Sequence, residues 1–451
     1  MSDHPLFDRA LRALFVAMAV GIAWGIRGDF GGVLGAMYPG AVLGLGFAFV
    51  SGQESILRRM PVLALLGGLL IGMGGDMSYG ILHGYAKSDT FINYSYGFFT
   101  LLLQGGCWGL FGGAAIGMAL DDRRPVWWEA ALAAVGVVVS GLLLEQFVEH
   151  VLHFQVDSRG NSIVPFIGGG IVFVIWMALR GYGYGLRGAF FGFLGFGGGM
   201  FFGRFLSNWS HQIPVTMNNW NIMEIGCGFI GGLIFTCGMI GLPDRSEDPP
   251  EGASPMSIVG MIYAVALIPL MHLVLLVRPA EKKAEWIGTL TQYGRSDASA
   301  LADQTQTWLL LVTLMGFVIF GIWYWWHAAE RNDLGWQPVM GLTLLMILFH
   351  NIHSLFFYQP RVEHSFKTPV IFWLFFILMG VYAAWRREHE AIDTDDEDAW
   401  LPMVARWAGA LVIVFTATLV LAGAINGEET MKSAEMRWPT WSFRDGTPPP
   451  R

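Results

Sequence analysis

Apolar residues gather in long runs along this chain, and short polar stretches separate the runs. A helix of roughly 17–25 apolar residues is long enough to cross the ~30 Å hydrocarbon core of a bilayer. Runs of about this length lie near 10–26, 30–50, 61–84, 96–120, 127–152, 163–179, 188–206, 221–242, 256–277, 307–328, 338–358, 368–385 and 403–425. The pattern therefore predicts an all-α integral membrane protein, a polytopic bundle of about 13 transmembrane helices.

The composition supports a membrane protein. Hydrophobic residues make up 54% of the 451 residues and charged residues only 14%, which is too apolar a balance for a water-exposed globule. The 59 glycines and 19 tryptophans also fit, because small residues let helices pack closely in lipid and tryptophan collects at the headgroup level. A formal net charge of -8 argues against a nucleic-acid partner.

Polar segments divide the chain into parts. Residues 1–242 form a glycine-rich membrane core, and the proline- and acid-rich stretch 243–255 is a polar linker. A second group of membrane helices is expected over 256–425, with an external loop at 278–306. The tail 426–451 is polar and is expected to be disordered.

The distribution of arginine predicts the orientation in a cytoplasmic membrane. With a cytoplasmic N-terminus, and a first apolar run retained as a span, the short cytoplasmic loops collect most of the arginines of the first half. These are Arg9, Arg12, Arg58, Arg59, Arg123, Arg124, Arg180 and Arg187. An odd number of spans then places the C-terminus outside.

Two arginine-centred glycine clusters, 25–35 and 185–195, share the pattern G-[I/L]-R-G-x-F-x-G-x-L-G. Each sets a full charge, Arg27 or Arg187, beside an apolar run, where insertion scales assign a cost of at least ~2.5 kcal/mol. About five predicted spans separate them, so the second copy enters the membrane inverted, as in many secondary transporters. Chance similarity in a glycine-rich chain is the alternative, and aligning Gly106 with Gly226 gives a different period.

Three carboxylates accompany the arginines. Asp29 follows Arg27 by two residues, Asp76 lies in the glycine-rich end of the third run, and Glu224 opens the eighth run. A carboxylate in apolar surroundings is either paired or neutral, which suits a site for a coupling proton or sodium ion. The predicted substrate-binding residues are Arg27, Asp29, Asp76, Arg187 and Glu224. Static pairs that hold helices together are the alternative.

A second polar cluster lies where the run 127–152 ends. It contains Glu145, Glu149, His150 and His153, and the i, i+4 spacing puts Glu149 and His153 on one helix face. Carboxylate and imidazole at this spacing can bind a metal or relay protons. Further histidines, His350, His353 and His364, come from another predicted helix end. A metal site of Glu149, His153, His350 and His353 is the alternative to ordinary hydrated helix ends.

Three functions remain open on the sequence. The first is a proton- or sodium-coupled secondary transporter of a small polar or anionic solute, which carries out no chemical reaction. The second is a membrane enzyme that acts on a lipid-linked substrate with the Glu/His cluster, and the third is a non-catalytic subunit of a membrane complex. The expected partners are the bilayer, the solute, and further copies or subunits. The P-loop pattern G-x-x-x-x-G-K-[S/T] does not occur, which excludes ATP-driven transport by this motif.

Overall fold

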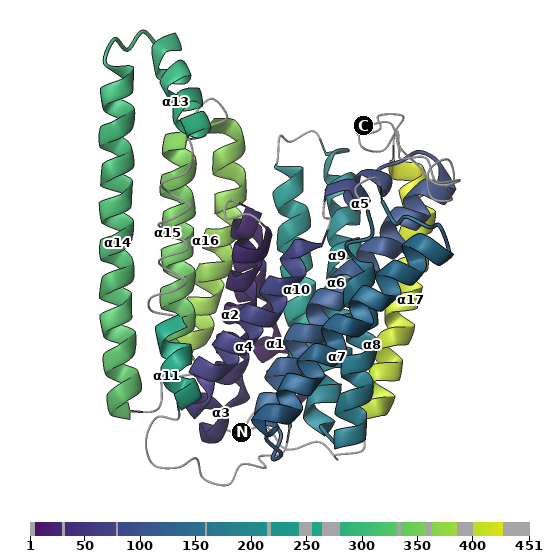
Figure 1. Ribbon diagram of the computed structural model, residues 1–451. Helices are drawn as coiled ribbons and strands as arrows, with labels where there is room; N and C mark the ends of the chain where they lie inside the picture. The colour runs from purple at the N-terminus through teal and green to yellow at the C-terminus, as the bar shows by residue number, and fades with distance from the viewer. Residues whose placement is uncertain are drawn as a thin grey trace.

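The computed structural model describes residues 5–28, 32–77, 80–157, 160–213, 218–242, 255–263, 280–331, 335–357, 362–385 and 400–426. Within these ranges every regular element is a helix (Figure 1). Eight of these helices are long and apolar enough to cross a membrane: Leu6–Arg27, Gly32–Ser51, Phe91–Leu120, Trp127–Val151, Gly183–Ser210, Asn219–Met239, Ala298–Trp326 and Trp400–Ile425. The chain is therefore a multi-pass, all-α protein of membrane type.

The elements follow the predicted runs closely. In chain order they are α1 (Pro5–Arg27), α2 (Gly32–Ser51), α3 (Glu54–Arg58), α4 (Met60–Met73), η2 (Gly74–Asp76), α5 (Gly80–Tyr85), α6 (Phe91–Leu120), α7 (Trp127–Gln146), η3 (Phe147–Val151), α8 (Val164–Arg180), α9 (Gly183–Ser210), α10 (Asn219–Met239), α11 (Pro255–Ile262), α13 (Ala280–Gln292), α14 (Ala298–Arg331), α15 (Gln337–Phe357), α16 (Val362–Trp385) and α17 (Trp400–Ile425). Three further apolar helical stretches are shorter: Met60–Asp76, Val164–Arg180 and Val370–Trp385. Most of the predicted run 256–277 lies outside the described residues, and 13 spans stays a prediction.

Six helices form a closed ring. Helix α1 packs on α2, α2 on α4, α4 on α6, α6 on α9, α9 on α10, and α10 returns to α1. Helices α7 and α8 pair with each other beside this ring, and α17 lies against α9. On the other side, α15 and α16 contact α1, and α14 contacts α15 (Figure 1). The ring is the packed centre of the molecule.

Glycine spacing explains why α6 and α9 lie so close together. Four glycines recur at every fourth position of α6, which places them on one face: Gly105, Gly109, Gly113 and Gly117. A Cβ atom at these positions would overlap backbone oxygens of α9, at Phe196, Gly192, Gly188 and Tyr184 in turn. The descending order of these partners shows that the two helices are antiparallel. Repeated small residues let the backbones touch, as is typical of helix pairs in lipid.

The two arginine clusters lie at opposite ends of the ring. Arg27 is the last residue of α1, and its partner Glu224 lies in the second turn of α10. Arg187 lies in the second turn of α9 and contacts Gly238 near the other end of α10. At ~1.5 Å per residue, Glu224 and Gly238 are about 21 Å apart along the axis. We call the two ends of the bundle the Arg27 end and the Arg187 end.

A helix break lies at the Arg27 end. Helix α4 stops at Met73 and continues as the single 3-10 turn η2. A Cβ atom at Gly74 would overlap the indole of Trp108, and one at Gly32, the first residue of α2, would overlap the carbonyl oxygen of Gly75. The break therefore packs directly against the start of α2 and against α6, where only glycine fits.

Candidate functional site

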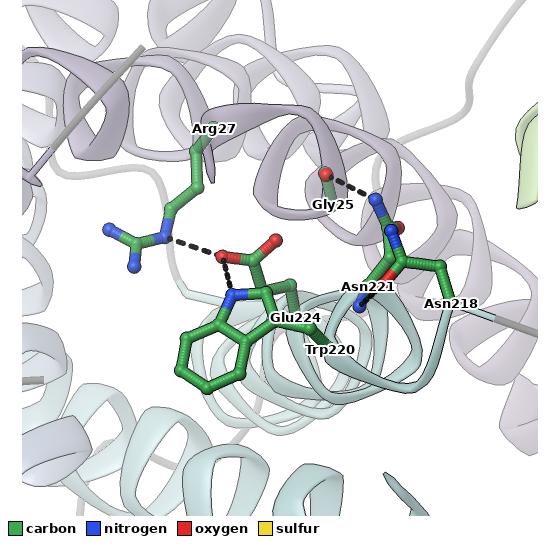
Figure 2. A network of polar contacts seen from close by, with 6 residues as sticks. All are labelled: Gly25, Arg27, Asn218, Trp220, Asn221 and Glu224. Atoms are coloured by element: carbon green, nitrogen blue, oxygen red, sulfur yellow. Dashed lines mark hydrogen bonds and ion pairs between the residues drawn. The ribbon is translucent and has the colours of Figure 1, made fainter. Parts of the chain in front are cut away.

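A buried ion pair joins α1 to α10. Arg27 Nε lies 3.7 Å from Glu224 Oε1, and the two side chains are 5% and 2% exposed. Trp220 donates from its indole nitrogen to the same carboxylate oxygen over 3.2 Å (Figure 2). Burying either charge alone is costly, so the two groups stabilise each other as a neutral pair.

The start of α10 positions Glu224. Asn218 caps the helix, because its side-chain oxygen accepts a hydrogen bond from the backbone nitrogen of Asn221 over 3.2 Å. Asn221 in turn donates from Nδ2 to the carbonyl oxygen of Gly25 over 3.0 Å, which satisfies a carbonyl in the last turn of α1. Trp220 and Glu224 are four residues apart and therefore share a helix face. Figure 2 shows this cap and the ion pair in one network.

Aromatic rings surround the guanidinium. Its Cζ atom lies 5.0 Å from the ring centroid of Trp108 and 5.6 Å from that of Trp24, within the range of cation–π attraction. The two indole rings are themselves 5.0 Å apart. Trp24 is fully buried, and its indole nitrogen has no hydrogen-bond partner among the described residues. The site therefore combines a cation, a carboxylate and a buried donor within an apolar wall.

Gly28 brings the backbone of α1 against the carboxylate. A Cβ atom at this position would lie 3.1 Å from Glu224 Oε2 and 3.2 Å from Oε1. The carboxylate thus fills the space that any larger residue would need. This close approach is the structural role of the second glycine of the first cluster.

A row of polar side chains connects the pair to the exposed surface of the Arg27 end. The buried ring of His83 packs edge-on against Trp220, with centroids 5.2 Å apart. Four residues further on, Lys87 Nζ lies 3.4 Å from His211 Nε2, and His211 contacts Asn219. Burial, and secondarily the charge of Arg204, lowers the pKa of Lys87 to about 8. Trp220 is half-buried and contacts both Glu224 and His83.

Sequence reasoning overlooked the burial of two further arginines, Arg12 of α1 and Arg204 of α9. Arg204 of α9 is 1% exposed and donates from Nε to Asn208 Oδ1 over 2.8 Å, with Ser207 as a further partner. Asn208 donates to the carbonyl oxygen of Ala86 over 3.0 Å and to Asn426 over 2.8 Å. The signal was present, since Arg204 places a full charge within the apolar run 188–206.

Arg187 lies in different surroundings. It is 2% exposed and donates from Nε to the carbonyl oxygen of Gly238 over 2.6 Å. Nearby, Asp121 accepts hydrogen bonds from the backbone nitrogens of Tyr184 and Gly185, over 3.2 and 3.0 Å, at the start of α9. Arg187 therefore ties α9 to α10 at the opposite end of the ring from Arg27.

Of the four predicted binding residues that the structure describes, two are brought together. Arg27 and Glu224 form the pair, whereas Arg187 is at the far end of α10. Asp76 is exposed in η2, because the helix break turns it out of the apolar core. Asp29 lies outside the described residues. Among the described residues, a carboxylate from the distant helix α10 meets Arg27.

The Glu/His cluster stays spread out. Glu145 of α7 is half-buried, and Glu149 and His150 of η3 are exposed. His153 is exposed beyond the end of η3 and has a φ of 49°, so the expected helix face shared by Glu149 and His153 is not formed. His350 is buried on α15 beside Phe372, on the other side of the ring from α7 (Figure 1). The side chains of His353 and His364 lie outside the described part. Among the residues described, no group of three or more His, Cys, Asp or Glu is placed to hold a metal ion.

In the Arg27–Glu224 pair both side chains are at most 5% exposed, whereas in the other ion pair of helix α1, Arg12–Asp8, the Asp8 side chain is 11% exposed. Comparisons with protein-family models, curated proteins and solved structures gave no match. Function is therefore inferred from the geometry of this site and from the physical chemistry of buried charges.

Proposed function

We propose that the protein is a secondary transporter that moves a small polar or anionic solute across a cytoplasmic membrane through a site at Arg27 and Glu224. One observation carries the proposal: an ion pair with side chains only 5% and 2% exposed lies inside a ring of membrane-type helices. Buried ion pairs rarely stabilise a fold more than apolar side chains of the same size. Ionisable groups retained within such helices typically line solute or ion pathways.

Interrupted helices support the same function. Helix α1 ends beside the pair, α4 breaks at η2, and Trp108 packs on that break while it contacts Arg27. Helix ends inside a membrane protein offer backbone groups to a solute only where they line a cavity or are buried in protein. Secondary transporters commonly place their sites at such breaks.

Charge asymmetry supports an orientation for transport. The Arg187 end carries the arginines of the loops and helix ends that connect α2 to α4, α6 to α7 and α8 to α9. Under the positive-inside rule this end faces the cytoplasm, together with the first residues of α1. The Arg27 end then faces outward, and a solute reaches Glu224 past Trp220. The coupling ion is a proton or sodium.

Uptake into proteoliposomes tests the proposal. The purified protein would be offered radiolabelled acetate, succinate, phosphate, sulfate, glycine or glucose, with an imposed proton or sodium gradient. We expect gradient-driven uptake of at least one solute, and a loss of about 30-fold or more in Arg27→Gln, equivalent to ~2 kcal/mol of lost binding. The matched control is Arg58→Gln, because Arg58 pairs with Glu54 on the exposed surface. Uptake that is equal in wild type and Arg27→Gln contradicts the proposal.

A further inference from the structure

A lysine and a histidine meet at the surface of the Arg27 end. We infer that Lys87, His211 and Asn219 form a binding site for a small anion. This inference rests on the proposed function and narrows it, because it makes the transported solute an anion. It also gives that solute a first binding site on the side proposed to face outward, before it reaches the buried residues Arg27 and Glu224.

Segments that are distant in the sequence form the site. Lys87 lies between α5 and α6, and its Nζ atom is 3.4 Å from Nε2 of His211, which follows the end of α9. Asn219, the first residue of α10, brings its amide nitrogen within 2.7 Å of His211 Nδ1 and 3.1 Å of Nε2. Ser210 donates to the amide oxygen of Asn219 over 2.8 Å, which directs the amide nitrogen to the imidazole. Three nitrogen-bearing side chains therefore converge at one point.

Hydrogen-bond donors outnumber acceptors around Lys87. The ammonium group has three N–H donors and no acceptor, while a neutral imidazole offers one acceptor nitrogen for Lys87 and Asn219 together. Among the described residues, no carboxylate lies within ion-pair distance of Lys87. Asp89, the nearest acid in the sequence, is exposed and accepts hydrogen bonds from the hydroxyls of Ser88 and Thr90. A bound anion would supply the acceptor atoms, through hydrogen bonds strengthened by charge.

A buried arginine adds positive charge beneath the site. Arg204 is 1% exposed, and its Nε donates to Asn208 Oδ1 over 2.8 Å. Asn208 in turn donates to the carbonyl oxygen of Ala86, the residue before Lys87, over 3.0 Å. The charge of Arg204 adds to burial in lowering the pKa of Lys87 to about 8. The same charge attracts an anion, and water screens it little because the guanidinium is buried.

Two histidines are titratable groups close to Lys87. His83, in the short helix α5, stays neutral, because burial and then the charges of Arg204, Arg27 and Lys87 hold its pKa well below the ordinary value. These three charges are all positive, so the electrostatic potential around His83 favours an anion. His211 is exposed and belongs to the site itself. Above neutral pH, Lys87 is therefore the group whose loss of a proton should weaken anion binding.

An amide side chain holds the backbone around Lys87. Asn426, which follows the end of α17, donates to the carbonyl oxygens of Ala86 and Ser88 over 3.0 and 2.8 Å, on either side of Lys87. The lysine is therefore presented by a fixed segment before an anion arrives. Such preorganisation reduces the entropy that is lost on binding.

Anion binding to the detergent-purified full chain is the direct test. Sodium acetate, sulfate or nitrate would be titrated at low ionic strength from pH 7 to 10, where the charge of these anions is constant, and calorimetry would give the affinity. Glucose is the uncharged control. We expect at least one of the anions to bind and glucose not to bind. The affinity should fall about tenfold per pH unit well above pH 8, as Lys87 loses its proton.

Variants of Lys87 locate the bound anion. Lys87→Gln should bind it about tenfold or more weakly at pH 7 and without the dependence on pH. Lys87→Arg should restore binding and keep it up to pH 10, because a guanidinium stays protonated. The matched control is Lys283→Gln, which should behave as wild type, because Lys283 pairs with Asp303 on the exposed surface. No anion binding in wild type, equal binding in Lys87→Gln, or a fall above pH 8 that persists in Lys87→Arg overturns the inference.

Failure of the anion site can be told apart from failure of the proposed function. If proteoliposomes take up glucose or glycine but the protein binds none of the three anions, the anion site is refuted and the transporter proposal stands. If an anion binds through Lys87 but no solute crosses the bilayer, the anion site stands and transport is refuted. Where an anion is transported, Lys87→Gln should raise the KM for its uptake about tenfold. An unchanged KM refutes capture at Lys87 and leaves transport intact.

Discussion

The clusters 25–35 and 185–195 have nearly the same sequence but different surroundings. Arg27 ends a helix and meets a carboxylate from α10, with indole rings around its guanidinium. Arg187 lies within the first turns of α9 and donates to the carbonyl oxygen of Gly238. Both arginines thus contact α10, at its two ends. The motif therefore specifies close backbone packing, whereas the partner supplied by the neighbouring helix determines which interaction the arginine makes.

Equivalent glycines show the same contrast in finer detail. A Cβ atom at Gly32 or at its counterpart Gly192 would overlap a backbone oxygen of a neighbouring element, so these two positions serve the same role. At Gly188 the overlap is again with a backbone oxygen, that of Gly113. At its counterpart Gly28 the nearest atom is instead Glu224 Oε2, a side-chain tip at 3.1 Å. At this matched position, only the first cluster faces a side chain that can move.

The largest expected difference in the free energy of unfolding is between substitution of Arg27 and substitution of Arg187. Arg27→Gln leaves Glu224 buried without its partner and should destabilise the protein by about 3–5 kcal/mol, whereas Arg187→Gln loses a charged hydrogen bond to a carbonyl, worth about 1.5–3 kcal/mol. Glu224→Gln should largely rescue Arg27→Gln. It should be additive with Arg187→Gln within about 0.5 kcal/mol, because those sites are far apart.

Denaturant or thermal unfolding in detergent measures these two cycles. The cycle through Arg187 and Glu224 is the control for any general effect of neutralising Glu224. Equal coupling energies in the two cycles would show that Glu224 depends on Arg27 no more than on the distant Arg187.

The next largest difference in stability is expected between alanine substitutions at the matched glycines Gly188 and Gly28. Gly188→Ala forces the backbones of α9 and α6 apart and should cost about 1–3 kcal/mol, the range for overpacked cores, or more. Gly28→Ala needs only a shift of a few tenths of an ångström in the Glu224 carboxylate and should cost less than about 1 kcal/mol. The melting temperatures of the two variants check this. A cost at Gly28 as large as at Gly188 would show that the carboxylate is held rigidly.

Much of the fold was predictable because membrane-length apolar runs set where helices form. The shortened α4 shows the limit of that reasoning. Gly74 and Gly75 belong to an apolar run that continues to residue 84, but their close contacts with Trp108 and Gly32 break the helix. An exposed Asp76 follows from that break. A hydropathy value is averaged over many residues, so it does not reveal a helix break that is confined to a single turn.

The candidate site could be predicted only in part for a different physical reason. A charged residue in or beside an apolar run is energetically unfavourable and therefore conspicuous in the sequence. Arg27 and Glu224 were each identified in this way, but separately. Their pairing depends on which helices close the ring, and that depends on glycine faces such as Gly105 to Gly117, whose partners cannot be read from one sequence. Trp24 and Trp108 were missed because a tryptophan within an apolar run is indistinguishable from ordinary core or belt residues.

Substitution of Trp220 tests how much its indole hydrogen bond to the Glu224 carboxylate contributes to stability. Trp220→Phe removes the hydrogen bond to Glu224 Oε1 and should destabilise the protein by about 1.5–3 kcal/mol, since the acceptor is charged and buried. Trp209→Phe is the matched control, because Trp209 is 51% exposed on the neighbouring helix α9. Thermal unfolding at pH 8, compared with pH 5, measures both. Equal effects of the two substitutions would mean that the contact with Glu224 contributes little.

The smallest expected effect is a difference in the pH dependence of stability between two half-buried cations, Lys87 at the Arg27 end and Arg59 at the Arg187 end. Burial lowers the pKa of Lys87 at the Arg27 end to about 8, below its ordinary 10.5, so the unfolded chain binds more protons than the folded one between these values. Stability should therefore rise with pH from about 8 to 10.5 through this group.

Lys87→Met should flatten that rise and stabilise the protein at pH 7 by about 1 kcal/mol or less, since water screens a half-buried charge. Arg59 at the Arg187 end is the control. It donates to the carbonyl oxygen of Ala119 over 2.9 Å, and its guanidinium stays protonated throughout this range, so Arg59→Met should lower stability by the same amount at every pH. Melting temperatures from pH 7 to 10.5 check both variants. A rise with pH that is identical in Lys87→Met and wild type would mean that Lys87 keeps its solution behaviour and that the Arg27 end is open to water at that residue.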